Sequence, residues 1–170
     1  VEEFKFADGT IIAANLVNLP PVFSSNGGGA TAAIAIAENT MAVTTVVASD
    51  PNPGDTVTYA LAGGADEAKF SINATTGELS FIAAPDFETP GSAAGSNVYD
   101  VVVQASDGVA VDTQTLSVTV SNVNEPATGL PVIDDATPAA GSVLSVNTAG
   151  IVDPDGVIGG ITYQWASSND

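Results

Sequence analysis

The chain contains no cysteine and no histidine among its 170 residues. Without these side chains it cannot form a zinc site of thiolates or imidazoles, a cysteine nucleophile or a Ser-His-Asp triad. Few enzyme classes remain. The absence of cysteine does not indicate a compartment, because an extracellular protein can fold without disulfides.

Basic side chains are almost as scarce. Lys5 and Lys69 face twenty aspartates and glutamates, and the formal net charge is −18. Nucleic acids and anionic membranes are bound through Lys and Arg, so this composition excludes both as partners. Such an excess also opposes compaction through self-repulsion unless counter-ions neutralise it. Oxygen-binding cations such as Ca²⁺ are therefore expected partners, and the alternative is that the acidity serves solubility alone.

Long hydrophobic runs are also missing. No apolar stretch approaches the roughly 20 residues that cross a bilayer, and no segment resembles a signal peptide. Val1 is not an initiator methionine, so we expect a piece of a longer protein whose secretion signal lies elsewhere. The sequence predicts a soluble segment without direct membrane insertion.

The residues that are present favour β-structure. Hydrophobic residues make up 45% of the chain and aromatic residues only 6%, with 17 glycines and 10 prolines. Turn signals recur between short β-rich runs, which is typical of an all-β Greek-key sandwich of about seven strands. The expected strands are 31–37, 43–48, 56–62, 69–72, 78–82, 97–106 and 110–121.

Two local patterns refine this prediction. Alternation along residues 97–106 places one set of side chains on the core face, namely Tyr99, Val101, Val103 and Ala105. The sequence "ADEAKF" (65–70) is compatible with one helical turn, and no longer segment keeps a 3.6-residue period. Helices are expected to be minor.

Three segments are expected along the chain. Residues 1–17 read as two short strands around Asp8-Gly9, the tail of a preceding module, and residues 18–125 form the sandwich. Residues 126–170 read as the first half of a second β module, which either continues beyond the chain or is completed by 1–17. "SDPNPGDTVTYAL" and "VDPDGVIGGITYQW" share an acidic Asp-Pro turn that leads into Thr-Tyr, which suggests tandem modules.

The acidic residues gather at expected strand ends and loops. Asp86 and Glu88 are two positions apart, so extended backbone points both carboxylates the same way, as a cation with six to eight oxygen ligands requires. The enzymatic alternative is a glycosidase pair with carboxyl groups about 5 to 9 Å apart across a sugar cleft, which a small sandwich rarely provides. For Asp50 and Asp107 the alternative is an Asx-turn. We expect no enzyme.

Seven motifs follow one another over residues 20–126: "PVF", "AEN", "SDPNPGD", "FSINATTGEL", "PDFE", "VVVQASDG" and "VSNVNEP". In this order they resemble a bacterial cadherin-like domain. The resemblance implies Ca²⁺ clamped at the poles of the sandwich by carboxylates and by the linker to the next module.

The resemblance implies two sets of metal ligands. The C-terminal junction set is Glu38, Asp86, Glu88, Asn122, Asn124, Glu125, Asp153 and Asp155. The N-terminal pole set is Asp50, Asn52, Asp55 and Asp107. The linker reads Asn-Val-Asn-Glu where the family prefers Asp-x-Asn-Asp, and position 52 is Asn, so both sets carry less negative charge than the family pattern.

The flanks carry two further resemblances. "VEEFKFADGTI" is similar to the segment that follows the calcium repeats of repeats-in-toxin proteins. "TPAAGSVLSVNTAGIVDPDGVIGGITYQW" is similar to the first half of an Ig-like module of large bacterial surface proteins.

Together these resemblances imply a calcium-stiffened extender or adhesion module of a secreted bacterial surface protein. Its expected partners are neighbouring β modules of the same chain and a cell-surface glycan or protein, and we expect a monomer. The alternative is a module that binds polysaccharide or peptide with the help of Ca²⁺.

Overall fold

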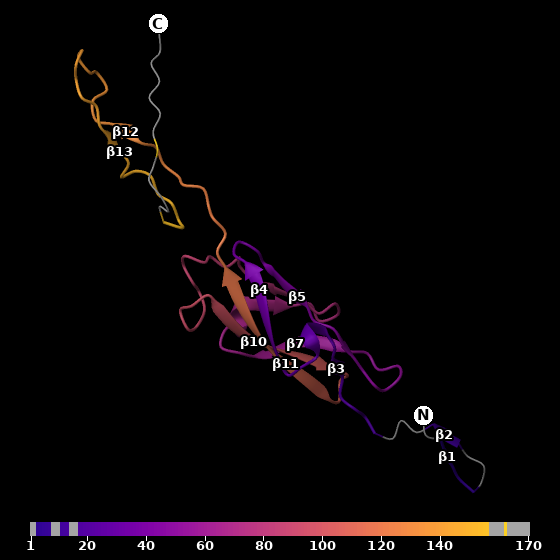
Figure 1. Cartoon of the computed structure of the whole chain (residues 1–170). Helices are drawn as coiled ribbons and strands as arrows, with labels where there is room; N and C mark the ends of the chain where they lie inside the picture. Colours follow the sequence, from indigo (N-terminus) through magenta and orange to yellow (C-terminus); the bar gives the residue numbers. More distant parts are fainter. Residues whose placement is uncertain (1–2, 8–10, 14–16, 157–161, 163–170) are drawn as a thin grey trace. The chain divides into compact units, whose positions relative to one another are not determined.

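A computed structural model describes residues 3–7, 11–13, 17–156 and 162. Its elements are β-strands and two 3-10 turns, η1 (Ser25–Gly27) and η2 (Glu67–Lys69), so the predicted all-β class is confirmed (Figure 1). The turn expected in "ADEAKF" is η2. The chain divides into two compact units, Val1–Asn122 and Val123–Asp170, which are described separately.

The first unit contains a four-stranded sheet in the order β4-β11-β10-β7. β10 (Val98–Ser106) and β11 (Val111–Ser121) form a long antiparallel hairpin. β4 (Thr31–Ala37) lies parallel to β11, and β7 (Thr58–Gly63) lies antiparallel to β10. Because β4 and β11 are parallel, they are joined by a long crossover, which here contains the strands β5 to β10.

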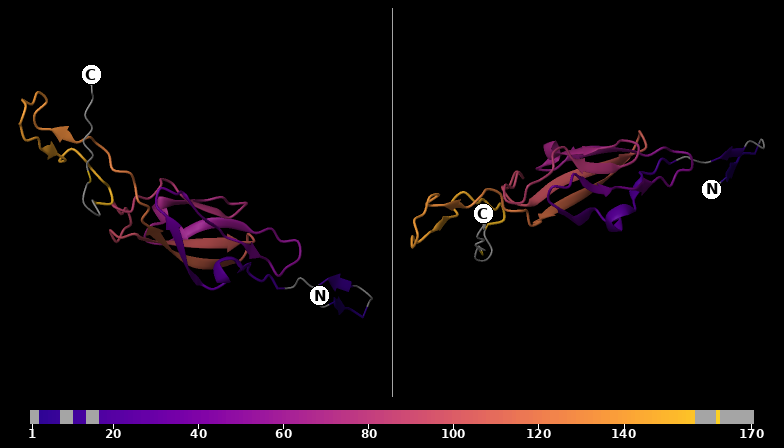
Figure 2. Two further views of the ribbon diagram at one scale, coloured as in Figure 1. Left: turned by 45° about the horizontal axis from the view of Figure 1, so that its top comes forward. Right: turned by 90° about the horizontal axis from the view of Figure 1, so that it is seen from above.

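A three-stranded sheet, β5-β9-β8, completes the sandwich. Its strands are β5 (Ala42–Thr45), β8 (Phe70–Ile72) and β9 (Glu78–Phe81). A smaller pair joins β3 (Val22–Phe23) to β6 (Ala48–Ser49). The chain passes from one sheet to the other between β4 and β5, returns through β6 to β7, and crosses again between β7 and β8 and between β9 and β10, as in a Greek key; Figure 2 gives two further views.

The core lies between the two larger sheets. Tyr99, Val101, Val103 and Ala105 are buried, which confirms the predicted face of β10. The Tyr99 ring stands edge-on to Phe81 of β9 at a centroid distance of 5.0 Å, a favourable aromatic arrangement. The core cluster is completed by Phe23, Val46, Phe70, Leu79, Leu116, Val118 and Val120.

The single strand predicted at 43–48 is wrong, because the structure divides it into β5 and β6. Between them the N–H of the buried Val46 donates to the Gly77 carbonyl at 2.9 Å, and the Val47 carbonyl accepts from Ser24 and Ser25. Apolar content predicts that such a segment is buried and extended, but not that it changes partner strand midway. The two-residue β3, to which β6 pairs, was not predicted.

The flanking segments contain short strand pairs. β1 (Glu3–Lys5) pairs antiparallel with β2 (Ile11–Ala13), and the expected Asp8-Gly9 turn lies outside the described residues. In the second unit β12 (Val132–Ile133) pairs with β13 (Val146–Asn147). The expected strand around "GGITYQW" lies outside the described residues except for residue 162. No helix in the described part of the chain is long and apolar enough to cross a membrane.

Candidate metal centre

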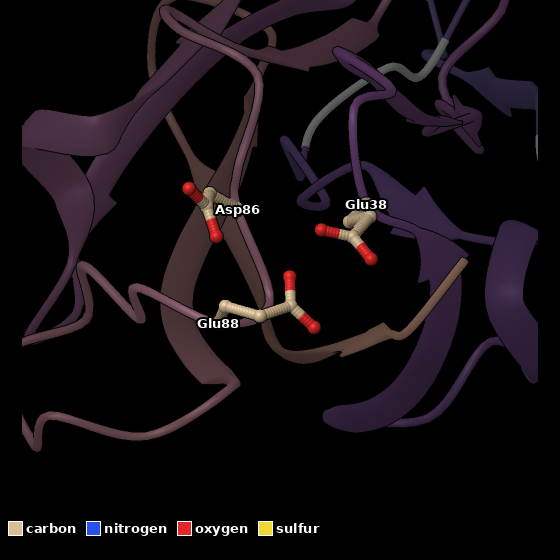
Figure 3. A group of neighbouring side chains, drawn as sticks. All are labelled: Glu38, Asp86 and Glu88. Atoms are coloured by element: carbon tan, nitrogen blue, oxygen red, sulfur yellow. The ribbon is translucent and has the colours of Figure 1, made fainter. Parts of the chain in front are cut away.

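Three carboxylates of the predicted junction set meet in the first unit, and we call Glu38, Asp86 and Glu88 the C-terminal cluster. Glu38 directly follows β4, and the other two lie in the segment between β9 and β10. One oxygen atom from each carboxylate lies within 4.8 Å of the others. Figure 3 shows the carboxylates of Glu38 and Glu88 facing each other, with Asp86 beside them.

Backbone hydrogen bonds fix the segments that carry this cluster. The Glu38 N–H donates to the Ser121 carbonyl at the end of β11, and the Asn39 N–H donates to the Pro85 carbonyl, both at 2.9 Å. The Glu38 Oε2 atom accepts the Phe87 N–H at 2.8 Å. Phe87 packs against the core between the two acidic positions, so its neighbours Asp86 and Glu88 remain exposed.

The C-terminal cluster concentrates negative charge without a basic side chain among its members. Glu38 is only 2% exposed, and burial of an ionised carboxylate is costly unless it is paired. The Asn122 amide donates to the Glu88 Oε1 atom at 2.7 Å, which brings one predicted linker residue to the cluster. Carboxylate and amide oxygens suit Ca²⁺ and Mg²⁺ rather than zinc.

A second group, the N-terminal cluster, is Asp50, Asp55 and Asp107. One oxygen from each again lies within 4.8 Å of the others. The Asp50 Oδ1 atom accepts the Asn52 N–H at 2.7 Å, whereas its Oδ2 atom is buried and has no hydrogen-bond partner. A buried carboxylate oxygen without a partner requires an explanation, and an oxygen-binding cation provides one. The donor set therefore fits Ca²⁺.

Asn52, the fourth predicted residue of the N-terminal pole, has a different environment. Its side chain is buried, the Oδ1 atom accepts the Leu19 N–H at 2.8 Å, and the Nδ2 group donates to the Val17 carbonyl at 3.0 Å. Asn52 thus holds the chain where it enters the sandwich. Asn18, which the sequence did not single out, donates to the Asp107 Oδ2 atom at 2.8 Å.

The remaining predicted residues lie in the second unit. The Glu125 N–H donates to the Asp155 Oδ2 atom at 2.6 Å, so these two residues are brought together. Asp153 begins the turn that contains Asp155, and its Oδ1 atom is buried without a hydrogen-bond partner. Asn124 donates to the Glu125 carbonyl at 3.2 Å.

The hydrogen bonds to Asp107 hold the pKa of its carboxyl below the usual value. The largest cause is the Ala110 N–H, followed by the Val109 N–H and the Asn18 amide. A carboxyl with a lowered folded-state pKa stabilises the fold above its unfolded pKa, near 3.9, and that contribution disappears as the pH falls through the folded value.

We therefore expect Asp107→Asn to reduce the free energy of unfolding at pH 6, because the variant lacks the charged acceptor. Between about pH 4 and pH 2 the difference from the parent protein should shrink, because protonation removes the same charge from Asp107. Urea unfolding in EDTA at several pH values measures this difference. A gap that stays constant down to pH 2 would contradict the assignment.

Comparison with known proteins identifies the family. The sequence model of the Cadherin domain matches residues 32–121, and the chain belongs to this family. The chain is 32% identical over 126 residues to mouse Protocadherin-15, covering 69% of this chain and 6% of that protein. It is 31% identical over 125 residues to human Protocadherin Fat 1, covering 70% of this chain and 3% of that protein. The chain thus spans a small part of these relatives.

Solved structures agree in fold. The human Protocadherin-24 EC1-2 crystal structure (Form II) superposes with a TM-score of 0.52 at 24% identity, covering 81% of this chain and 61% of that chain. Drosophila N-cadherin EC1-4 gives a TM-score of 0.51 at 22% identity, covering 69% and 27%. The cadherin-like resemblance and the sandwich are confirmed. Cadherin domains are extracellular adhesion-type modules that bind Ca²⁺ and are not enzymes.

Proposed function

We propose that this chain is a Ca²⁺-binding extender or adhesion module, in which bound Ca²⁺ stiffens a tandem array of β-sandwiches. The observation that carries the proposal is the C-terminal cluster: three carboxylates, one of them 2% exposed, converge in a chain with two lysines. Without a cation these charges repel, and with one they become ligands. The unpartnered Asp50 oxygen supports a second site at the N-terminal cluster.

Ligand assignments follow from the side-chain oxygens. Glu38, Asp86 and Glu88, with Asn122, would hold one ion, and Asp50, Asp55 and Asp107 would hold another. Asn52 contributes to the second site by holding residues 17–19 and donating its N–H to Asp50. Chemistry and resemblance support Asn124, Glu125 and Asp155 as further ligands, and the buried Asp153 Oδ1 atom without a hydrogen-bond partner adds support for Asp153.

The wider setting is part of the same proposal. The order of the motifs and the character of both flanks support a secreted bacterial protein of the repeats-in-toxin type, with a preceding module that ends near residue 17 and an Ig-like module from residue 126. Neighbouring modules of the same chain are its main partners, and the module itself is a monomer. A glycan or protein on another cell would be its target.

The test exploits the burial of Glu38. Extracellular modules bind Ca²⁺ with dissociation constants of about 0.1 to 1 mM. At ten to a hundred times that concentration the ion would stabilise the fold by about 1.4 to 2.7 kcal/mol, a shift of roughly 3 to 10 °C in melting temperature. Glu38→Gln keeps an acceptor for the Phe87 N–H but removes the charge. We expect it to melt below the parent protein in Ca²⁺ and at or above it in EDTA.

Glu67→Gln is the matched control, because Glu67 is exposed in η2 and belongs to neither cluster. It should leave the calcium-induced shift unchanged. Calorimetric titration with CaCl₂ gives the number of ions and their affinity. A parent protein whose melting temperature is the same in Ca²⁺ and EDTA, with no heat of binding, would refute the proposal.

A further inference from the structure

The first unit contains a pocket of about 310 Å³, open to solvent, beside the C-terminal cluster. Its wall is mostly apolar and includes the aromatic residues Phe81 and Tyr99 together with Ile82 and Pro85. Ligand sites for small organic molecules begin at about 300 Å³ and combine apolar walls with a few polar groups. Here the polar groups are Lys69, Tyr99, Thr89 and Asp86.

Lys69 is an unusual residue in this protein. The protein has two basic side chains and twenty acidic ones, and Lys69 is one of the two basic residues. Within the described residues, however, no ion pair joins Lys69 to a carboxylate. Its backbone is fixed on both sides, because its N–H donates to the Asp66 carbonyl at 2.8 Å and its carbonyl accepts the Ile82 N–H at 2.9 Å. Lys69 is an exposed residue at the edge of the pocket, and an ammonium without an ion-pair partner beside apolar side chains is suited to an anionic ligand.

Tyr99 supplies a second, buried polar group. The residue is 3% exposed and lines the cavity, and its hydroxyl oxygen accepts the Gly91 N–H at 2.9 Å. That bond uses the oxygen as an acceptor, so the hydroxyl proton remains available for donation. The ammonium lies on the same side of the pocket as this hydroxyl: a Cβ atom built on Gly91 would lie 3.7 Å from the Tyr99 hydroxyl oxygen and 3.8 Å from the Lys69 nitrogen. The two donors are therefore near enough to each other to serve one carboxylate.

We propose that this cavity binds a small organic carboxylate with an apolar body. The carboxylate accepts from the Lys69 ammonium and the Tyr99 hydroxyl, and the apolar body packs against Ile82 and Pro85. A ligand with hydroxyl groups all round, such as a uronic acid, would leave most of them unpaired against this wall, which is costly.

Asp86 links the cavity to the C-terminal cluster, because it belongs to both. As a free carboxylate it repels an anionic ligand, and as a Ca²⁺ ligand it is neutralised. Calcium should therefore strengthen carboxylate binding, and by thermodynamic linkage the carboxylate should strengthen calcium binding by the same factor. This coupling rests on the proposed function, whereas carboxylate binding itself does not.

The experiment is a titration of the whole chain with 3-phenylpropanoate, followed by the backbone amide signals of the ¹⁵N-labelled protein. We expect saturable shifts at Gly91, whose N–H donates to Tyr99, and at Ile82. The neutral analogue 3-phenylpropan-1-ol and the polar anion glucuronate should bind at least about tenfold more weakly, since each lacks one of the two contributions.

Variants separate the parts of the proposal. Lys69→Gln should weaken 3-phenylpropanoate about tenfold, and Lys5→Gln, which removes the other positive charge, should not. In EDTA, the Asp86→Asn variant should bind the carboxylate with the affinity that the parent protein shows in Ca²⁺. Absence of shifts at Gly91 and Ile82 in both calcium and EDTA overturns the pocket, as does equal binding of glucuronate. Shifts that are identical with and without Ca²⁺ overturn only the coupling.

Discussion

Asp66→Ala is expected to lower the free energy of unfolding of the first unit by about 3 to 4 kcal/mol. Asp66 is 5% exposed, and its two carboxylate oxygens accept the Ala93 N–H at 2.6 Å and the Asp100 N–H at 2.9 Å. Each hydrogen bond to a charged group contributes about 1.5 to 3 kcal/mol, and alanine would leave both donors without acceptors. Because these bonds tie the segment after Gly91 to β10, their loss should also weaken the carboxylate pocket.

Urea unfolding, monitored by far-ultraviolet circular dichroism, measures the change in the free energy of unfolding. Asp66→Asn retains one side-chain acceptor and should lose about half as much stability. Glu67→Ala, on the adjacent exposed position, is the control and should change stability by less than about 0.5 kcal/mol. If Asp66→Ala and Glu67→Ala have similar effects, the two hydrogen bonds do not stabilise the unit as described.

The sequence does not distinguish Asp66 from the other acidic residues. It lies in "ADEAKF" beside the exposed Glu67, and no spacing rule separates a carboxylate that binds backbone from one that faces solvent. By contrast, the core face of β10 could be predicted because strict alternation of apolar and polar residues is a local property. Burial of Asp66 depends on residues about 30 positions later in the chain, and local patterns do not contain that information.

Gln114 illustrates the same limit within a well-predicted strand. Alternation places it on the core face with Leu116, and it is fully buried. Its amide donates to the Gly29 carbonyl at 2.7 Å and accepts from Asn26 at 3.1 Å, so it holds the η1 segment onto β11. The position of the side chain follows from the pattern, whereas the loop that satisfies it does not.

The candidate site could be predicted in its chemistry but only partly in its geometry. Asp86 and Glu88 are two residues apart, and their carboxylates lie close to that of Glu38, the proximity that spacing and resemblance together predict. That these groups bind a cation stays a prediction. At the other pole the acidic turn offers several oxygens within six positions. Asp55 joins Asp50 there, whereas the buried Asn52 faces the entering chain. Turn geometry decides which neighbour each side chain meets, and the spacing of residues does not give that geometry.

Gly77→Ala is expected to lower the free energy of unfolding by about 3 to 5 kcal/mol, the largest effect of any single substitution considered. Gly77 has a φ of +74°, a left-handed conformation that disfavours a side chain by about 1 to 2 kcal/mol. A Cβ atom there would also overlap the Val46 carbonyl oxygen and lie 3.3 Å from the Tyr59 ring. The backbone must move, which weakens the bond from the Val46 N–H to the Gly77 carbonyl.

The displacement should extend to the N-terminal cluster, because Val46 leads into β6 and Asp50 follows β6 directly. Tyr59, whose ring would be touched by the new Cβ atom, also links to β6, because its hydroxyl oxygen accepts the Ala48 N–H at 2.9 Å. Gly95→Ala is the matched control: its φ is +64°, but nothing lies within 4 Å of a Cβ atom there. It should lose only about 1 to 2 kcal/mol, the conformational part. If both variants lose the same free energy of unfolding, the close approach of Gly77 to Val46 does not constrain the fold. The segment with Asp50 would then be held by its own hydrogen bonds alone.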